Sequence, residues 1–177
     1  MARAAGFRRV HVILGADAPR LSAAIDAGAR AALGFESLRL LRVRAWREGM
    51  GGSLREALHR LPPGESAVVL MLLDQVGLSA GNLRRLATAW PRGGHCMVAA
   101  SPPGRRWPQV PVRLPRTLFA TAERHLVGDR GLAAWLQGLA PHRLQLVPMA
   151  GLDRDLDTPQ QASHWRHAPA WQIRRRF

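Results

Sequence analysis

Short apolar runs alternate with amphipathic patterns along the whole chain. Five apolar runs predict strands, at residues 10–14, 38–43, 67–73, 95–100 and 144–147. Apolar positions that recur at helical spacing between these runs predict helices around residues 21–28, 54–61, 83–90 and 132–139. Strands that alternate with helices of this length are typical of an α/β fold with a mainly parallel sheet. No repeat or linker divides the chain, so we expect one domain.

The residue pattern of some segments predicts where they lie in that fold. Residues 67–73 (AVVLMLL) are apolar on both faces, as in a central parallel strand that helices cover on each side. The Pro- and Arg-rich residues 101–115 indicate a loop or a short hairpin at an edge. Ser79 is expected to cap a helix, and residues 158–161 (TPQQ) fit the first turn of the last helix with Thr158 as its N-cap.

The composition is that of a chain that folds around its own core. Of the 177 residues, 47% are hydrophobic and 21% are charged, which excludes wholesale disorder. The single cysteine, Cys96, excludes a disulfide framework. The longest apolar run is far too short to cross a bilayer, and the first residues lack the apolar stretch of a signal peptide. We therefore expect a cytoplasmic protein with no membrane partner.

The net charge is +14, from 26 basic and 12 acidic residues. Clustered cations bind the phosphates of nucleic acids. Here, however, every basic residue is Arg, which indicates a GC-rich codon bias, and the only dense run is Arg174, Arg175 and Arg176. Tyr is absent and aromatic residues make up 6%, so no surface for stacking bases is evident. A nucleic acid is therefore disfavoured as the main partner, whereas affinity for another anionic ligand is expected.

Ligands of such sheets bind beyond the carboxyl ends of the strands, and residues 49–53 (GMGGS) follow one of these ends. Gly49 and Gly51 would let a ligand approach the backbone, with Ser53 beside them. Free N–H groups at a helix N-terminus favour anions or polar base edges. The alternative is that the glycines only shape a tight turn from strand to helix.

Asp74 directly follows the most apolar run, so it is expected at the carboxyl edge of the sheet. A carboxylate at that place can hold Mg²⁺ against substrate phosphates. The alternative is a helix cap or a salt bridge to one of the arginines.

Asp153, Asp155 and Asp157 alternate along the chain, so in an extended segment they would face one way. Such a group can bind a divalent cation or simply neutralise Arg154. Asp129, in the sequence GDRG, is expected in a turn at a helix start, where capping alone explains it.

Taken in order, these motifs resemble the MobA-like nucleotidyltransferases, in the branch of molybdenum cofactor cytidylyltransferases. That family has a strand ending in Gly, then G-M-x-x-S-L, an apolar strand ending in D-Q-P, a G-H-P-V segment, a G-D-x-G turn and D-I-D-T-P-E-D. The matching segments here are residues 12–18 (VILGADA), 49–55 (GMGGSLR), 73–75 (LDQ), 128–131 (GDRG) and 155–159 (DLDTP). The resemblance places a family domain at residues 1–162 and leaves residues 163–177 as a basic tail.

The resemblance implies a Rossmann-like three-layer fold with a mainly parallel sheet, which joins a nucleoside monophosphate from an NTP to a phosphorylated acceptor. In this branch the substrates are CTP and molybdenum-bound molybdopterin. Asp74 would be the catalytic acid that binds Mg²⁺. Asp155 and Asp157 would lie near the metal and the phosphates. The nucleobase and ribose would lie near Gly49, Gly51 and Ser53.

The chain departs from the family in three places. The family's first strand and its signature L-A-A-G-x-S-x-R-M-G, which cradles the triphosphate, have no counterpart here. Residues 106–110 (RWPQV) stand in place of the acceptor motif, and D-Q-P has become residues 74–76 (DQV). In a doubly wound sheet the first strand is central. Without it, residues 10–14 and 67–73 must pair directly or leave a gap lined by unpaired backbone groups.

Two accounts of these departures stay open. Either Met1 is an internal methionine of a longer reading frame, or the chain is a degenerate relative that has lost catalysis. The altered acceptor motif favours divergence. The corresponding functions are an active nucleotidyltransferase and a non-catalytic binding protein, a partner in the maturation of a molybdoenzyme.

Overall fold

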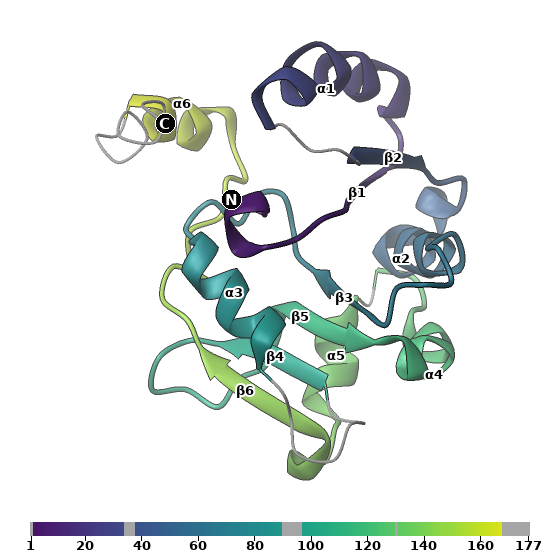
Figure 1. Ribbon diagram of the computed structural model, residues 1–177, viewed down its shortest axis with the longest axis vertical. Helices are drawn as coiled ribbons and strands as arrows, with labels where there is room; N and C mark the ends of the chain where they lie inside the picture. The colour runs from purple at the N-terminus through teal and green to yellow at the C-terminus, as the bar shows by residue number, and fades with distance from the viewer. Residues whose placement is uncertain (1, 34–37, 90–96, 130, 168–177) are drawn as a thin grey trace.

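The computed structural model describes residues 2–33, 38–89, 97–129 and 131–167 (Figure 1). Within these ranges, the strands are β1 (Val10–Leu14), β2 (Leu38–Arg42), β3 (Ala67–Leu70), β4 (Met97–Ser101), β5 (Gln109–Pro115) and β6 (Leu144–Pro148). The α-helices are α1 (Ala18–Leu33), α2 (Gly49–His59), α3 (Ala80–Thr88), α4 (Phe119–His125), α5 (Leu132–Gln137) and α6 (Pro159–His167). Short 3₁₀ turns lie at Arg3–Ala5, Ala45–Glu48, Arg116–Leu118 and Pro141–Arg143. The α/β fold class predicted from the sequence is confirmed.

The strands form two separate sheets. β1 and β2 make a parallel pair, and a four-stranded sheet has the order β3-β5-β4-β6. In the larger sheet β5 runs antiparallel to both β3 and β4, whereas β4 and β6 are parallel. The carboxyl ends of β4 and β6 therefore meet at one edge, where a ligand site is expected.

The four-stranded sheet lies between two helical layers, because alternate residues of a strand point to opposite faces. Met97 and Ala99 of β4 pack with residues of α2, α4 and α5. Val98 and Ala100, on the opposite face, pack with Leu86 of α3. All five residues of β4 are buried, so this strand forms the centre of the core.

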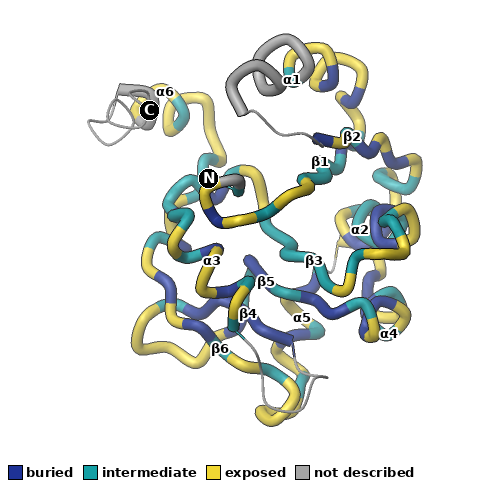
Figure 2. Tube along the Cα trace, viewed as in Figure 1, coloured by how far each residue is buried: buried dark blue, intermediate teal, exposed yellow. Residues whose placement is uncertain are grey.

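The prediction for residues 67–73 is wrong in its position. The strand is β3, which ends at Leu70, lies at the edge of the four-stranded sheet and pairs with β5 alone. Its four residues are only half-buried (Figure 2). Leu72 and Leu73, which were expected to continue it, are 36% and 75% exposed. An apolar run shows that side chains can be buried on both faces, but not which strands pair with it.

The prediction of an edge loop or hairpin for residues 101–115 is also wrong over its second half. β5 occupies Gln109–Pro115 and has a partner strand on each side. Pro111 lacks the N–H that a ladder needs. The sheet accommodates it because pairing with β3 begins at Val112, and the register with β4 shifts between Ala99 and Ala100.

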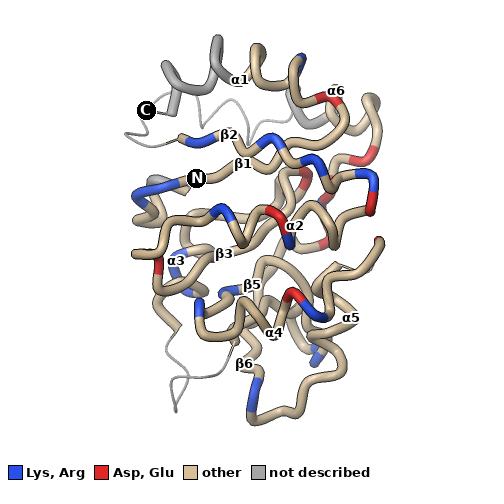
Figure 3. Tube along the Cα trace, turned by 90° about the vertical axis from the view of Figure 1, so that its right-hand side faces the viewer, with Lys and Arg blue, Asp and Glu red and all other residues tan. Residues whose placement is uncertain are grey.

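β1 and β3 do not pair directly, which answers the question raised by the absent first strand. In the described part of the chain no backbone hydrogen bond joins them. Along the long axis the strands nevertheless follow one another as β2, β1, β3 and β5 in two perpendicular views (Figures 1 and 3). The side chains of Arg9 and Glu65, just before β1 and β3, form a hydrogen-bonded ion pair between the two sheets.

Two predicted helix starts are confirmed. The hydroxyl of Ser79 accepts the N–H of Asn82 at 3.1 Å at the start of α3. At α6 the Thr158 hydroxyl accepts the N–H of Gln161 at 3.2 Å, and Gln161 Oε1 accepts the N–H of Thr158 at 2.8 Å. These reciprocal bonds form a capping box.

The predicted cap by Asp129 is wrong. The residue at the N-cap of α5 is Gly131, which has no side chain that could cap the helix. Helix α1 forms as expected, but Ala18 and Ser22 are buried, whereas Leu21 is 39% exposed. Predictions for Trp90, Cys96 and Arg174–176 concern residues outside the described ranges.

Arginines are spread over many elements, as expected from their scatter in the sequence (Figure 3). Among the described helices none is long and apolar enough to cross a membrane.

Candidate functional site

Two acidic segments meet beyond the ends of β3 and β6. The segment after β3 carries Asp74 and the segment after β6 carries Asp155. Gln75 and Asp155 form an antiparallel backbone bridge, and the N–H of Leu156 donates to the carbonyl of Asp74 at 3.1 Å. The pairing brings the two segments together, and the charge of Asp74 acts on the carboxyl of Asp155.

Each of the two carboxylates has one oxygen without a partner in the described part of the chain, and their negative charges repel each other. One oxygen of each, Oδ1 of Asp74 and Oδ1 of Asp155, is shielded from solvent and has no hydrogen-bond partner among the described residues. Burial raises the pKa of Asp155 above its usual value, and the negative charges of Asp74, Asp157 and Asp153 raise it further. A bound cation would stabilise such a site, because its positive charge offsets the repulsion between the carboxylates.

The amide of Gln75 holds the Asp74 segment in place. Gln75 is 4% exposed. Its Nε2 donates to the carbonyl of Val110 at 3.1 Å, and its Oε1 accepts the N–H of Leu72 at 3.3 Å. The side chain therefore ties the end of β3 to β5, and this is why a buried Gln follows Asp74.

A contact between two glycines fixes the two acidic segments to each other. A Cβ on Gly77 would lie 2.3 Å from the carbonyl oxygen of Gly151, and a Cβ on Gly151 would lie 2.4 Å from that of Gly77. Gly151 also has a φ of 82°, in the left-handed region. Only glycine lets the backbones approach this closely.

The other two acids of the predicted group, Asp153 and Asp157, are more exposed than Asp74 and Asp155. Asp153 and Asp157 are exposed, in contrast to the half-buried Asp155. The N–H of Asp157 donates to Gln161 Oε1 at 2.7 Å, which ties its backbone to the first turn of α6. The three aspartates therefore differ in burial, and the charges of Asp153 and Asp157 both act on Asp155.

The pair of Asp74 and Asp155 fits a divalent cation. Two carboxylates with buried, unpartnered oxygens are hard ligands, and Mg²⁺ is commonly held by one or two carboxylates with substrate phosphates and water completing its shell. The described residues contain no group of three or more His, Cys, Asp or Glu side chains arranged around a metal. The substrate would therefore have to supply the remaining ligands, and a role for Asp157 stays a prediction.

The glycine-rich segment begins helix α2 and contacts a distant loop of the chain. Gly49 has a φ of 89°, and a Cβ there would lie 2.4 Å from Asp129 Oδ1. A Cβ on Gly51 would lie 2.8 Å from the backbone of Leu126, and its N–H donates to the carbonyl of Gly128 at 2.8 Å. This close approach explains both glycines without a ligand, so their part in nucleotide binding stays a prediction.

Side chains of α2 reinforce this contact. Arg55 donates to the carbonyl of Leu126 at 3.1 Å. Ser53, half-buried, donates its hydroxyl to the carbonyl of Gly49 at 3.3 Å. Met50 remains 51% exposed beside them. The GMGGS and GDRG motifs, far apart in sequence, thus meet at one place.

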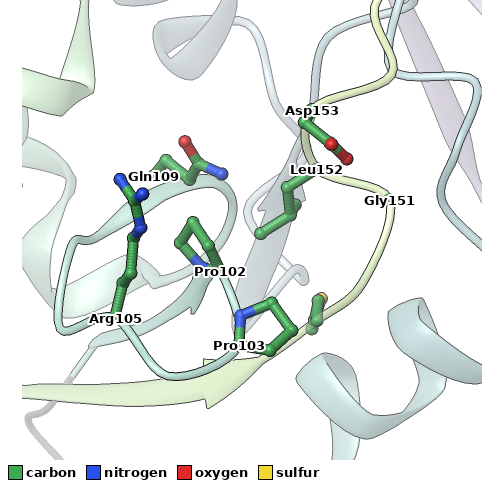
Figure 4. Close-up of a pocket in the computed structure, with 8 residues that line it drawn as sticks. Pro102, Pro103, Arg105, Gln109, Gly151, Leu152 and Asp153 are labelled. Atoms are coloured by element: carbon green, nitrogen blue, oxygen red, sulfur yellow. The ribbon is translucent and has the colours of Figure 1, made fainter.

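A cavity of about 390 Å³ opens at the carboxyl ends of β4 and β6 (Figure 4). It is lined by Pro102, Pro103, Arg105, Gln109, Met149, Gly151, Leu152 and Asp153. Arg105 and Gln109 stand on one side and Asp153 on the other, with the two prolines between them. Asp153, in the lining of the cavity, lies two residues before Asp155 on the same segment.

Arg105 and Gln109 were not predicted as site residues. The available signal was their position in a long polar stretch after a buried strand, at the edge where ligands bind. The prediction of an edge hairpin for this stretch obscured that signal, because a hairpin at the side of the sheet would lie away from the carboxyl ends of the strands, where ligands bind.

The chain matches one known protein family, that of the MobA-like NTP transferase domain, over residues 1–145. No curated protein matches it.

Three solved structures with a similar fold come from mycobacteria. The chain is similar to Rv0371c from Mycobacterium tuberculosis, with a TM-score of 0.68 and 26% identity over 94% of this chain and 80% of that chain. A structure of Rv0371c in complex with manganese gives a TM-score of 0.66 and 26% identity over 92% of this chain and 80% of that chain. The homologue from Mycobacterium sp. strain JC1 shares the fold, with a TM-score of 0.59 and 21% identity over 93% and 77% of the two chains.

Proposed function

The chain belongs to the family of MobA-like NTP transferase domains, and on that basis we propose that it transfers a nucleoside monophosphate from an NTP to a phosphorylated acceptor. The observation that carries this proposal is the pair of Asp74 and Asp155. The bridge of Gln75 with Asp155 joins the segments that carry them, and their Oδ1 atoms are buried without hydrogen-bond partners among the described residues. A nucleotidyl transfer needs a cation at such a place, because charge accumulates on the phosphates as the acceptor attacks the α-phosphorus.

Asp74 and Asp155 are the proposed cation ligands, with Asp157 as a further candidate. Mg²⁺ is the proposed ion, and the manganese complex of the mycobacterial relative supports a divalent cation in this fold. When bound, such an ion neutralises phosphate charge and aligns the triphosphate. The role of the two aspartates is to hold it at a fixed place, which their bridged segments support.

The nucleotide is proposed to lie against the start of α2, near Gly49, Gly51 and Ser53. No side chain of the described residues caps the first turn of this helix, and such an N-terminus favours polar or anionic ligands, although the N–H of Gly51 already donates to the carbonyl of Gly128. CTP is the favoured nucleotide, on the resemblance to the cytidylyltransferase branch.

The acceptor is proposed to occupy the cavity between Arg105, Gln109 and Asp153. A guanidinium is suited to the phosphate that such an acceptor carries. In the cytidylyltransferase branch the acceptor is molybdenum-bound molybdopterin, and we propose the same compound class here. The reaction belongs in the cytoplasm on this proposal.

The first test is a calorimetric titration of the protein with CTP and then GTP, each with and without Mg²⁺. We expect micromolar binding of one nucleotide that depends on Mg²⁺, followed by turnover with molybdopterin. No binding of either nucleotide would contradict the proposal.

A matched pair of variants tests the acid pair. Asp74→Asn removes one proposed ligand and should abolish the Mg²⁺-dependent part of nucleotide binding. Asp17→Asn removes an exposed carboxylate that contacts only Arg20 among the described residues, at 3.4 Å, and should bind as the unaltered chain does. Equal binding by both variants would contradict the role given to Asp74.

A second pair tests the acceptor site. Arg105→Ala should raise the KM for the phosphorylated acceptor while leaving nucleotide affinity unchanged, because Arg105 lines the cavity. Arg106→Ala, an exposed neighbour outside the lining, is the control. If the two variants have the same KM, the cavity does not hold the acceptor.

One observation favours a second candidate, a non-catalytic binding protein that takes part in molybdoenzyme maturation. The space beside Gly49 and Gly51, where a nucleotide is proposed, faces the chain's own residues 126–129 at close range. On this candidate the protein co-purifies with a molybdoenzyme subunit and does not turn over CTP. Turnover without any such partner would exclude it.

A further inference from the structure

His11, on strand β1, is a titratable residue that the proposed function does not use. Both of its ring nitrogens, Nδ1 and Nε2, are shielded from solvent, and neither has a hydrogen-bond partner among the described residues. A neutral imidazole has one N–H donor and one acceptor nitrogen, whereas the protonated ring has two donors and a positive charge. Protonation therefore places a charge where neither nitrogen is solvated, which is costly.

The charges that act on His11 come from three segments. Arg39 of β2 is its partner in the strand register, Arg9 precedes β1, and Glu65 precedes β3. Burial lowers the pKa of His11 below its usual value. The charge of Glu65 raises this pKa, and the charges of Arg9 and Arg39 lower it. The carboxylate of Glu65 is at the same time the ion-pair partner of Arg9, so the neutral ring is the favoured form in the folded chain.

The β1–β2 pair is fastened to the rest of the molecule mainly through side chains. No backbone hydrogen bond given for the described residues joins β1 to β3. The side-chain links include the ion pair of Arg9 with Glu65 and a small cluster in which Ile13 and Leu41 pack with Ala57 of α2. Elements with little buried apolar support open at a lower free-energy cost than central strands do. Opening of the pair would bring the His11 ring into water.

We propose that His11 makes the docking of the β1–β2 pair sensitive to acid, so that the pair opens from the rest of the molecule more often as the pH falls. In the closed pair the ring of His11 is neutral. In the open pair it reaches water and takes up a proton at its usual pKa of about 6.5. Because the pKa is lower in the closed pair, the stability of that pair is fully present above about pH 6.5 and is lost as the pH falls below it.

The chemistry of one histidine sets an upper limit to the effect. At pH 5.5 a histidine in the open pair is about nine-tenths protonated, which favours opening by at most about tenfold relative to pH 7.5. Any proton that the closed pair also takes up reduces this factor. We therefore expect opening to increase by about threefold to tenfold.

Amide hydrogen exchange of the full chain at pH 7.5 and 5.5 tests the proposal, with rates corrected for the pH dependence of intrinsic exchange. Protection should fall by about threefold to tenfold in Val10–Leu14 and Leu38–Arg42, and by less than about twofold in Met97–Ser101. His11→Phe keeps an aromatic ring that takes up no proton and should lose this pH dependence. His164→Gln, which removes an exposed histidine of α6, is the matched control and should keep it.

Protection that does not change with pH, that falls equally in Met97–Ser101, or that falls equally in His11→Phe would overturn the proposal. If His11→Phe does not fold, His11→Gln takes its place. NMR titration of the His11 ring in the unaltered chain needs no variant at all. A pKa below about 6.5 supports the proposal, and a pKa at or above this value overturns it.

Discussion

The fold places the carboxylate of Asp155 where its ionised form is disfavoured. Its Oδ1 is buried without a partner, beside the similarly placed Asp74. Burial and the neighbouring acids raise its pKa, so the folded protein favours the protonated form more than the unfolded chain does. Without a cation, ionised Asp155 therefore opposes folding.

The first prediction concerns Asp155→Asn. A group with a raised pKa in the folded state loses its stabilising contribution as the pH rises through that pKa. The variant should therefore match the unaltered chain below about pH 4, the ordinary range of an Asp carboxyl, and become the more stable of the two as the pH rises above it. Thermal unfolding at a series of pH values, with chelator present, measures this.

The same variant should bind Mn²⁺ at least about tenfold more weakly, because it removes one of two charged ligands. Asp17→Asn serves as the control, since its carboxylate is exposed. Greater stability of the unaltered chain at neutral pH in the absence of cation would contradict the charge repulsion described above.

The place of Asp74 beyond the carboxyl end of β3 could be predicted from the sequence, because an acid follows an apolar run there, whereas its role in holding a cation stays a prediction. The pairing of Asp74 with Asp155 could not be predicted, since it depends on a backbone bridge between segments far apart in the chain. The sequence also did not indicate that the buried side chain of Gln75 ties the end of β3 to β5. Its partner, Val110, belongs to a strand that the sequence did not predict.

At the scale of single elements, helix α2 depends on glycine where it meets residues 126–129. We predict that Gly51→Ala destabilises the protein by about 1–3 kcal/mol, because its Cβ would lie 2.8 Å from backbone atoms that cannot move independently. Gly81→Ala in α3 is the matched control. The nearest atom to its Cβ would be 3.6 Å away, so the change should be neutral or stabilising by up to about 1 kcal/mol. Chemical denaturation of both variants measures the difference, and equal effects would contradict the packing explanation.

Glu56 connects α2 to the turn before it. Its Oε2 accepts the N–H groups of Arg44 at 2.6 Å and Ala45 at 2.9 Å. The Ala45 hydrogen bond lowers the pKa of Glu56, and the Arg44 hydrogen bond and the charge of Arg60 add to this effect. A lowered pKa stabilises the fold at pH values above the ordinary Glu pKa, and this contribution is lost as the pH falls.

We therefore predict that Glu56→Gln is less stable than the unaltered chain at neutral pH. The difference should shrink as the pH falls below about 4.3, the ordinary pKa of a Glu carboxyl. Unfolding by urea at several pH values measures it. A difference that stays constant across this range would show that the charge of Glu56 contributes nothing.

Elements with a strong local signal could be predicted, and those defined by distant partners could not. The caps at Ser79 and Thr158 depend on residues within three positions of each other, and both form. The edge position of β3 and the central position of β5 depend on which strands pair. Pro111 made β5 resemble an edge, because the sequence does not show that the ladder is interrupted at that residue.

At the scale of the whole molecule, the two sheets differ in how much core supports them. The four-stranded sheet contributes to two large buried clusters, whereas the β1–β2 pair contacts a small one formed by Leu41, Val43 and Ala57. We predict that amides of Val10–Leu14 exchange on the order of 100-fold faster than those of Met97–Ser101 in the unaltered chain. Mass spectrometry of exchanged peptides measures both. Equal protection would show that the two sheets open as one unit.

The contact of Gly77 with Gly151 has a consequence for how ligands affect one another. Gly151 lines the cavity, and Gly77 belongs to the segment that carries Asp74. A ligand that pushes one segment towards the other must shift both, since the two backbones have no room to approach more closely. Ligands that displace these segments in the cavity and at the acid pair would be thermodynamically linked, so each would change the affinity for the other by the same factor.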